Sequence, residues 1–359
     1  MVRSAFCLAL AAVVLVGAAP TRHDGAEERS LRLGGIPLQI VSGRGSLWVV
    51  TCDRRCSGEG RRSTGRVIRI DPRRGRVTAA AALQRPGAIA VAEFGVFVTD
   101  FWRDSVRRFD PGTLRETASL KLVLPRQIRP RGATFLPTDL ALGANAVWVS
   151  TEWCALARVD QRLSRVVALV RLPCDAYQTM GAGAGAIWIS ESLAGLYRVD
   201  VATNRVVARI HVGPLSGRLV PTRLLFARGA ILAVGIWTQG GVSTRRNGLA
   251  RIDPTRNRVI AVTQLPSGPL AVAYGKGSLW VARIGGSSVD RVDPSTGRLL
   301  RRFDSRIGVA LAVAEQRALD GLARRDDSAA RSAVGRERRS RRYASQDHRE
   351  MDGSTRCRK

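Results

Sequence analysis

Three acidic side chains follow closely on short hydrophobic segments that have the pattern of β-strands: Asp100, Glu152 and Glu191. Three tryptophans lie in or near the same connections: Trp102, Trp153 and Trp237. Carboxylates gathered at one end of a fold can act as acid and base, and tryptophan rings offer a flat apolar surface to a ligand.

We interpret these residues, together with Arg103 and Arg283, as candidates for binding a sugar, a peptide or another polar ligand. Two alternatives stay open. In the first, the tryptophans only cover the mouth of a channel. In the second, two of the carboxylates form a catalytic pair.

Histidine is the commonest protein ligand of metal ions. The chain has three histidines, and only His211 lies within the repeated part of the sequence. Because no histidines or acidic residues cluster with the spacing of a metal site, the sequence predicts no metal and no cofactor.

Four cysteines of the repeated part form two local pairs: Cys52 with Cys56, and Cys154 with Cys174. Outside the cytosol these pairs are candidates for disulfides. A zinc site built from the same four residues is the alternative, although C-x3-C with a distant pair is poor zinc spacing.

The elements that must position these residues repeat six times along the chain. One is a short hydrophobic strand, such as GSLWVV at 45–50, whose central residue is usually tryptophan: Trp48, Phe97, Trp148, Trp188, Leu232 and Trp280.

A second element ends in an aspartate: Asp71, Asp110, Asp160, Asp200, Asp253 and Asp293. Aspartate can bond backbone N–H groups two residues on, and Gly or Asn tolerates the left-handed corner of a turn. We therefore expect these aspartates to be turn residues.

A third element precedes each tryptophan strand, for example PTDLALG at 137–143, and is weakest as QTMGAG at 178–183. Each unit thus holds four short strands within 40 to 51 residues. This pattern predicts an all-β protein, a β-propeller of four-stranded blades with strands A to D running outward from the axis.

Six complete blades are expected from about residue 36 to residue 303. SLRLGG at 30–35 has the pattern of a further outer strand, and IGVALAVAE at 307–315 that of a further inner strand. Together they predict an incomplete seventh blade that is closed by the N-terminal strand.

The repeat, a W–V strand followed by R–I/V–D–P–x–x–G/N–R–V, resembles that of the bacterial YVTN/YncE-type and virginiamycin B lyase-like propellers over about residues 30–315. The resemblance implies an exported seven-bladed propeller, with lyase activity in some members and nucleic-acid binding in others. The lyase members use a histidine pair with a glutamate and a divalent metal, whereas His211 is the one histidine of these repeats. The resemblance thus implies the fold more than an activity.

Arg3 precedes an apolar run over 5–19, which is too short to span a bilayer comfortably, since about 20 residues are needed. A basic start and a short apolar segment ending in small residues are typical of a secretory signal peptide. We expect a signal peptide and leader over 1–29 and the propeller over 30–315, in a protein that is secreted or held in the periplasm or cell envelope. No transmembrane segment would remain after cleavage. A buried strand or helix formed by the apolar run is the alternative.

Residues 316–359 are basic and hold almost no large aliphatic side chains, so they cannot form blade strands. We expect this tail to be disordered. It is either a genuine extension or the result of a reading-frame change that replaced the end of blade seven.

The formal net charge is +29, and only three of the 58 basic residues are lysines. Such a charge invites a nucleic-acid or polyanion interpretation, but the arginines fall on both expected faces of the propeller. The leading interpretation is a monomeric, exported, non-catalytic propeller. It would bind a small molecule, a glycan or a protein on the face formed by the B–C and D–A connections. A metal-assisted lyase and a nucleic-acid-binding protein are the alternatives.

Overall fold

The computed structural model describes residues 13–18, 26–31, 33–53, 64–101, 103–123, 125, 137–151, 155–172, 177–191, 195–212, 218–239, 242–265, 269–283 and 288–304. Within these ranges the chain forms strands and turns, with no helix.

Six antiparallel sheets of four strands each make up the blades. Blades 1 to 3 comprise β3 (Ile36–Gly43), β4 (Ser46–Cys52), β5 (Gly65–Asp71), β6 (Arg76–Leu83), β7 (Pro86–Ala92), β8 (Gly95–Asp100), β9 (Ser105–Phe109), β10 (Glu116–Lys121), β11 (Pro137–Gly143), β12 (Ala146–Thr151), β13 (Ala155–Asp160) and β14 (Val166–Arg171). Blades 4 to 6 comprise β15 (Tyr177–Gly183), β16 (Ala186–Glu191), β17 (Gly195–Asp200), β18 (Arg205–His211), β19 (Arg218–Ala227), β20 (Ala230–Gln239), β21 (Val242–Asp253), β22 (Arg258–Leu265), β23 (Pro269–Gly275), β24 (Ser278–Arg283), β25 (Ser288–Val292) and β26 (Leu299–Asp304). The predicted all-β propeller with six complete blades is confirmed.

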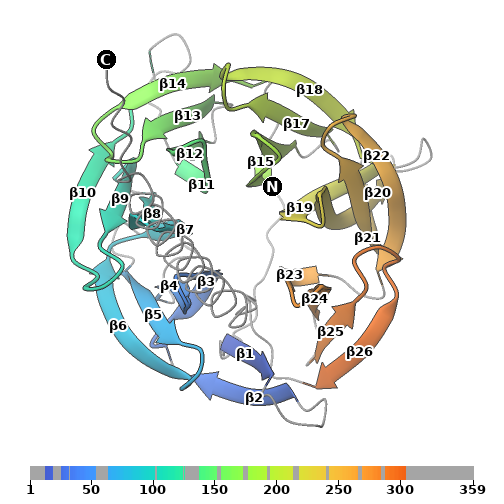
Figure 1. Ribbon diagram of the computed structural model, residues 1–359, viewed down its shortest axis with the longest axis horizontal. Helices are drawn as coiled ribbons and strands as arrows, with labels where there is room; N and C mark the ends of the chain where they lie inside the picture. Colours follow the sequence, from blue (N-terminus) through green and yellow to red (C-terminus); the bar gives the residue numbers. More distant parts are fainter. Residues whose placement is uncertain are drawn as a thin grey trace, which may run out of the picture. The chain divides into compact units, whose positions relative to one another are not determined.

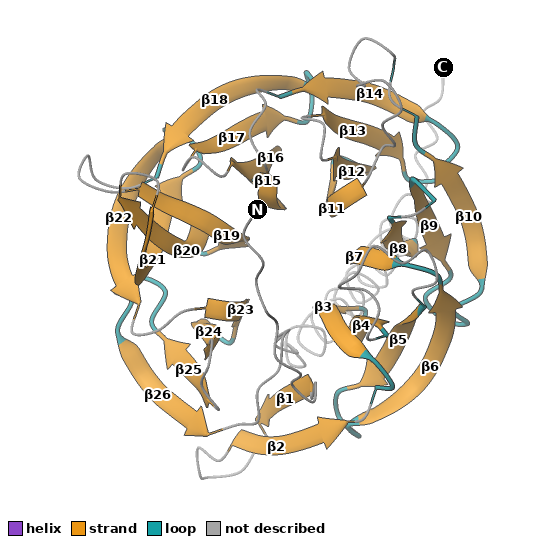
Figure 2. Cartoon of the chain, turned by 180° about the vertical axis from the view of Figure 1, so that it is seen from behind, coloured by secondary structure: helices purple, strands orange, loops and turns teal. Residues whose placement is uncertain are grey.

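The first strand of each blade lies nearest the axis, and the fourth lies on the circumference (Figure 1). The view from behind shows the same arrangement (Figure 2). The inner strands are β3, β7, β11, β15, β19 and β23. The fourth unit, whose inner strand has the weakest sequence pattern, still forms β15 and a complete blade.

The hydrophobic core is divided among the interfaces between neighbouring blades. Trp48 of blade 1 lies in one cluster with Ile89 of blade 2, and Trp148 of blade 3 shares another with Ile187 of blade 4. Both tryptophans are almost fully buried. Each indole N–H also donates to the carbonyl of a glycine at the end of the inner strand of its own blade, Gly43 or Gly143. The repeated tryptophans therefore hold the blades together and do not face a ligand.

An arginine lies opposite the tryptophan on the third strand and connects one blade to the next. The guanidinium of Arg158 stacks over Trp148, 5.5 Å from the ring centroid. Its Nη1 donates to the Val201 carbonyl at 3.0 Å and to Asn204 Oδ1 at 2.9 Å, both in the turn of blade 4. Arg69 reaches the turn of blade 2 in the same way. Part of the arginine content of the repeat is therefore structural.

The repeat aspartates are turn residues, as predicted. The Oδ1 atom of Asp200, for example, accepts hydrogen bonds from the backbone N–H groups of Ala202 and Thr203. Equivalent bonds form at Asp71, Asp110, Asp253 and Asp293, and Asp160 binds residues slightly farther along. Positive φ at the end of each turn, as at Asn204, explains why Gly or Asn recurs there.

Residues before blade 1 form a two-stranded sheet of β1 (Val13–Ala18) and β2 (Ala26–Leu31). Figure 1 shows β2 on the circumference between β26 and β6. The outer strand expected over 30–35 therefore lies earlier, at 26–31. The strand expected over 307–315 lies outside the described residues. Because β1 falls within the expected signal peptide, cleavage remains a prediction.

Candidate functional site

Each inner strand contains one extra residue relative to its neighbour, at the same place in all six blades. The pairing shifts between Pro137 and Asp139 in β11 and between Pro221 and Arg223 in β19, with equivalent shifts in the other four blades. Such β-bulges re-aim side chains and are frequent beside functional sites. The bulges lie near the start of each inner strand. This is the end of the channel at which the D–A connections enter the inner strands.

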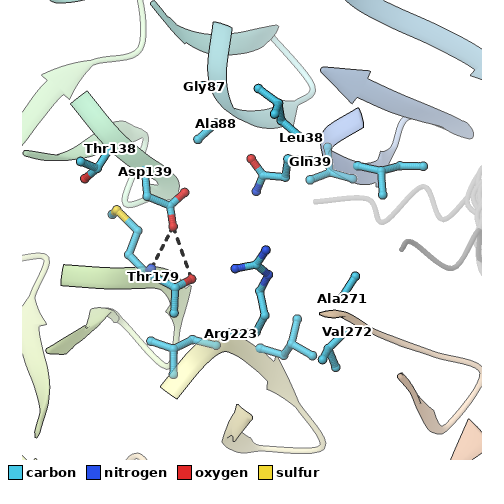
Figure 3. A pocket seen from close by; sticks show the side chains of 15 residues that line it. Leu38, Gln39, Gly87, Ala88, Thr138, Asp139, Thr179, Arg223, Ala271 and Val272 are labelled. Carbon is cyan, nitrogen blue, oxygen red and sulfur yellow. Dashed lines mark hydrogen bonds between the residues drawn. The ribbon is translucent and has the colours of Figure 1, made fainter. Parts of the chain in front are cut away.

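The residues at this position differ from blade to blade, unlike the repeated tryptophans and aspartates. They are Gln39, Ala88, Asp139, Thr179, Arg223 and Ala271. All six line one cavity of about 360 Å³, which is bounded by the inner strands of all six blades (Figure 3). The volume lies within the range of small-molecule sites, and four of the six side chains are polar.

Asp139 connects two blades at the edge of this cavity. Its Oδ1 accepts the N–H of Leu140 at 2.8 Å, and its Oδ2 accepts the N–H of Met180, in blade 4, at 3.0 Å. The hydroxyl of Thr179 lies 3.4 Å from Oδ2. Burial raises the pKa of Asp139, although these hydrogen bonds and the positive charge of Arg223 act in the opposite direction. The cavity therefore contains a carboxyl group whose negative charge is incompletely compensated.

Gln39 has the same relationship to its neighbouring blade, because its Oε1 accepts the N–H of Ile89 at 2.7 Å. Hydroxyl groups of the second strand accept the N–H groups at the bulges of blades 2, 3 and 4: Thr99, Ser150 and Ser190. Side chains thus satisfy backbone groups that the bulges remove from the sheet ladder. The bulges are therefore stabilised by hydrogen bonds within the protein itself.

Arg223 is the cation of the cavity, and its half-buried side chain points into it (Figure 3). Its Nη1 donates to the Thr222 carbonyl at 2.7 Å. That is the one hydrogen bond of its side chain to the residues that the structure describes. Because a guanidinium has five N–H donors, about four remain for a ligand or water.

Three predicted site residues occupy equivalent places at this end of the channel. Asp100, Glu191 and Arg283 each pair with the first residue of the inner strand of the same blade. The register therefore brings them to one face of the propeller, as expected. Their role in ligand binding remains a prediction.

Asp100 and Arg103 contact each other. The backbone N–H of Arg103 donates to Asp100 Oδ1 at 3.2 Å, and Arg107 Nη1 lies 3.8 Å from Oδ2. The Asp100 side chain is 1% exposed, whereas Arg103 is exposed and its Nε donates to Gln84 Oε1. These contacts link the end of β8 to Arg103 and to Arg107 of β9.

Trp237 was expected in a B–C loop, but it lies within β20 and pairs with Leu219. The first three strands of blade 5 are longer than any strand of the other blades. Gly248 on β21 leaves room for the indole. The partly buried ring packs on the core between blades 4 and 5.

The remaining predicted residues of this face lie outside the described residues: Trp102, Glu152, Trp153, Cys56, Cys154 and Cys174. Cys52 is disulfide-bonded, and its pairing with Cys56 remains a prediction.

His211 ends the outermost strand of blade 4 and is exposed, so it does not reach the channel. In the part of the chain that the structure describes, no three His, Cys, Asp or Glu residues lie together in a way that would hold a metal ion.

The repeat pattern does not single out Asp139 and Arg223 as site residues, because it assigns both to inner strands. The sequence nevertheless contains a sign of the site. In PTDLALG and PTRLLFA, Asp139 and Arg223 place opposite charges at the same position of the repeat, inside strands that are otherwise largely apolar. Aligning the third element of the repeat would have shown it.

The fold and its channel define a β-propeller with a polar central cavity. No protein-family model matches the chain, and neither does any curated protein. Among solved structures, hydrazine synthase of Kuenenia stuttgartiensis is similar with a TM-score of 0.61 and 14% identity, over 83% of this chain and 93% of that one. BamB of Moraxella catarrhalis gives a TM-score of 0.47 and 16% identity, over 74% and 72%. At these identities the first likeness shows the fold alone.

Among the described residues, no helix is long and apolar enough to cross a membrane.

Proposed function

We propose that this chain is an exported, non-catalytic β-propeller of the YVTN/YncE type that binds a small polar ligand. The ligand enters from the face formed by the B–C and D–A connections and reaches the channel cavity. The protein acts as a monomer outside the cytoplasm.

The observation that supports this proposal best is the set of bulged positions around the cavity. Packing and turn residues repeat faithfully from blade to blade, whereas these positions hold Gln39, Asp139, Thr179 and Arg223 in four different blades. Backbone geometry alone does not require polar side chains there, since Ala88 and Ala271 occupy the same position in the other two blades. A ligand that contacts several blades explains the difference.

The proposed entrance to this site lies on the loop face. Asp100, Glu191 and Arg283 lie at the same end of the inner strands as the bulges. Trp102 and Trp153, which follow the second strands of blades 2 and 3 in the sequence, stay candidates for contacting the ligand. A larger ligand, either a glycan or a protein segment, would reach the same cavity by inserting into the channel.

The test is ligand-observed NMR with a panel of sugars, organic acids and amino acids. Ala271→Leu fills part of the cavity, and Ala80→Leu makes the same change at an exposed site on β6. We expect saturation transfer to at least one compound with the natural chain and with Ala80→Leu, and its loss with Ala271→Leu. Equal transfer in all three proteins, or none in any, would contradict a channel site.

A further inference from the structure

Two opposite charges face the channel cavity from blades 3 and 5. Asp139 lies on β11 and Arg223 on β19, and both line the same space (Figure 3). The positive charge of Arg223 favours the ionised form of Asp139. Within the described part of the chain, however, neither side chain forms an ion pair within 4.0 Å.

Each charge is held in place by contacts that leave its cavity side available. Asp139 is fixed by the backbone of β11 and β15, and Arg223 by the carbonyl of Thr222. The carboxylate has about four lone-pair sites, of which the two N–H groups and the Thr179 hydroxyl use three. The guanidinium keeps about four donors. Both groups can therefore bind a partner without breaking the contacts that position them.

The geometry points to a ligand that carries both charges: we propose that the cavity binds a small zwitterion of the amino-acid class. Its carboxylate would bind Arg223, whose planar fork matches a carboxylate better than a point charge does. Its ammonium group would lie at Asp139. This inference rests on the proposed function, because it names the ligand class of the channel site.

Ligands with a single charge fit less well. A simple carboxylate at Arg223 would introduce a second negative charge beside Asp139, and a simple amine at Asp139 would add a positive charge beside Arg223. Burying an unpaired charge is costly, so the zwitterion, which compensates both groups, is the better ligand.

The test is isothermal titration calorimetry at pH 7 with glycine, β-alanine and 4-aminobutyrate, whose charges are separated by increasing distances. Acetate and methylammonium serve as single-charge probes. We expect at least one zwitterion to bind about tenfold more tightly than either probe. Because one decade of affinity corresponds to about 1.4 kcal/mol, this preference needs only one additional favourable contact.

Arg223→Gln should weaken zwitterion binding at least tenfold, and Arg223→Lys should weaken it to a lesser degree because the charge stays and the fork is lost. Asp139→Asn should abolish the preference for the zwitterion over acetate. Arg228→Gln, at an exposed turn of the same blade, is the matched control and should bind as the natural chain does. Melting temperature and far-UV circular dichroism establish that each variant is folded.

Zwitterions that do not bind, or that bind equally well to folded Arg223→Gln, would overturn this proposal. If Ala271→Leu still abolishes binding of a sugar or a neutral compound, the channel site stands and only the ligand class is wrong. If Ala271→Leu leaves every binding event unchanged, both proposals fail.

Discussion

The carboxylate of Asp139 in blade 3 accepts the backbone N–H of Met180 in blade 4, with 3.0 Å between Oδ2 and the nitrogen. Gln39 makes the equivalent bond from blade 1 to Ile89 of blade 2. The side chains at the bulges of blades 1 and 3 thus fix the inner strands of blades 2 and 4. Two of the residues that make the cavity polar therefore also hold its wall together.

Replacing Asp139 by asparagine tests both its hydrogen bonds and its charge. Asparagine has one acceptor oxygen, so one of the two bound N–H groups loses its partner, which costs about 1–3 kcal/mol. The raised pKa of Asp139 means that its ionisation disfavours the folded state. The natural chain should therefore lose stability, relative to Asp139→Asn, as pH rises above about 4 and through the pKa of the folded protein. Urea unfolding from pH 4 to pH 8 measures this, and a difference independent of pH would contradict a buried titrating carboxyl group.

Arg158 should contribute to stability far more than a neighbouring exposed arginine. Lysine at this position cannot reproduce the bonds to both Val201 and Asn204 or the stacking on Trp148. We expect Arg158→Lys to lower the free energy of unfolding by roughly 1–3 kcal/mol. Arg162→Lys, in the exposed turn of the same blade, should change it by less than about 0.5 kcal/mol. If chemical denaturation shows the same loss of stability for Arg158→Lys and Arg162→Lys, Arg158 does not act as a link between blades.

The turn aspartates should make the propeller sensitive to acid. The N–H and the hydroxyl of Thr203 bind Asp200 Oδ1 and lower the pKa of that carboxyl group. A lowered pKa contributes stability above the unfolded value, near about 4, and this stability is lost as pH falls through the folded value. Asp200→Ala should therefore melt at a lower temperature than the natural chain at pH 7, and the difference should shrink toward pH 2. A difference that grows in acid would be the opposite of this expectation.

The disulfide at Cys52 should be local. If its partner is Cys56, as predicted, the closed loop is short and the chain-entropy model gives about 2 kcal/mol of stabilisation. Non-reducing peptide mapping should show a peptide that contains both residues, and Cys52→Ser should lower the melting temperature only under oxidising conditions. A peptide joining Cys52 to Cys154 or Cys174 would contradict the local pairing.

The fold was predictable because its determinants are local and repeated. A buried side chain, tryptophan in four of the six blades, and a turn aspartate recur at fixed places in every blade, and a short window of sequence shows both. The outer strand at 26–31 and the position of Trp237 within β20 were not predictable in the same way. One depends on pairing with β1, and the other on the unusual length of the blade 5 hairpin.

The cavity residues were harder to find for a different reason. Asp139 and Arg223 are 84 residues apart in the chain and meet only because six blades close around an axis. In each inner strand, the bulge turns one side chain toward the channel. The alternating pattern of a regular strand does not identify that side chain. Local pattern therefore predicts the blades but not which of their residues share the cavity.

The most direct test of a channel site is the position of a bound ligand in crystals soaked with β-alanine and its homologues. We expect difference density in the cavity between β11 and β19, with a carboxylate within hydrogen-bonding distance of Arg223 and an amino group beside Asp139. Density confined to the outer surface, or a cavity that holds only solvent at saturating ligand, would contradict the account.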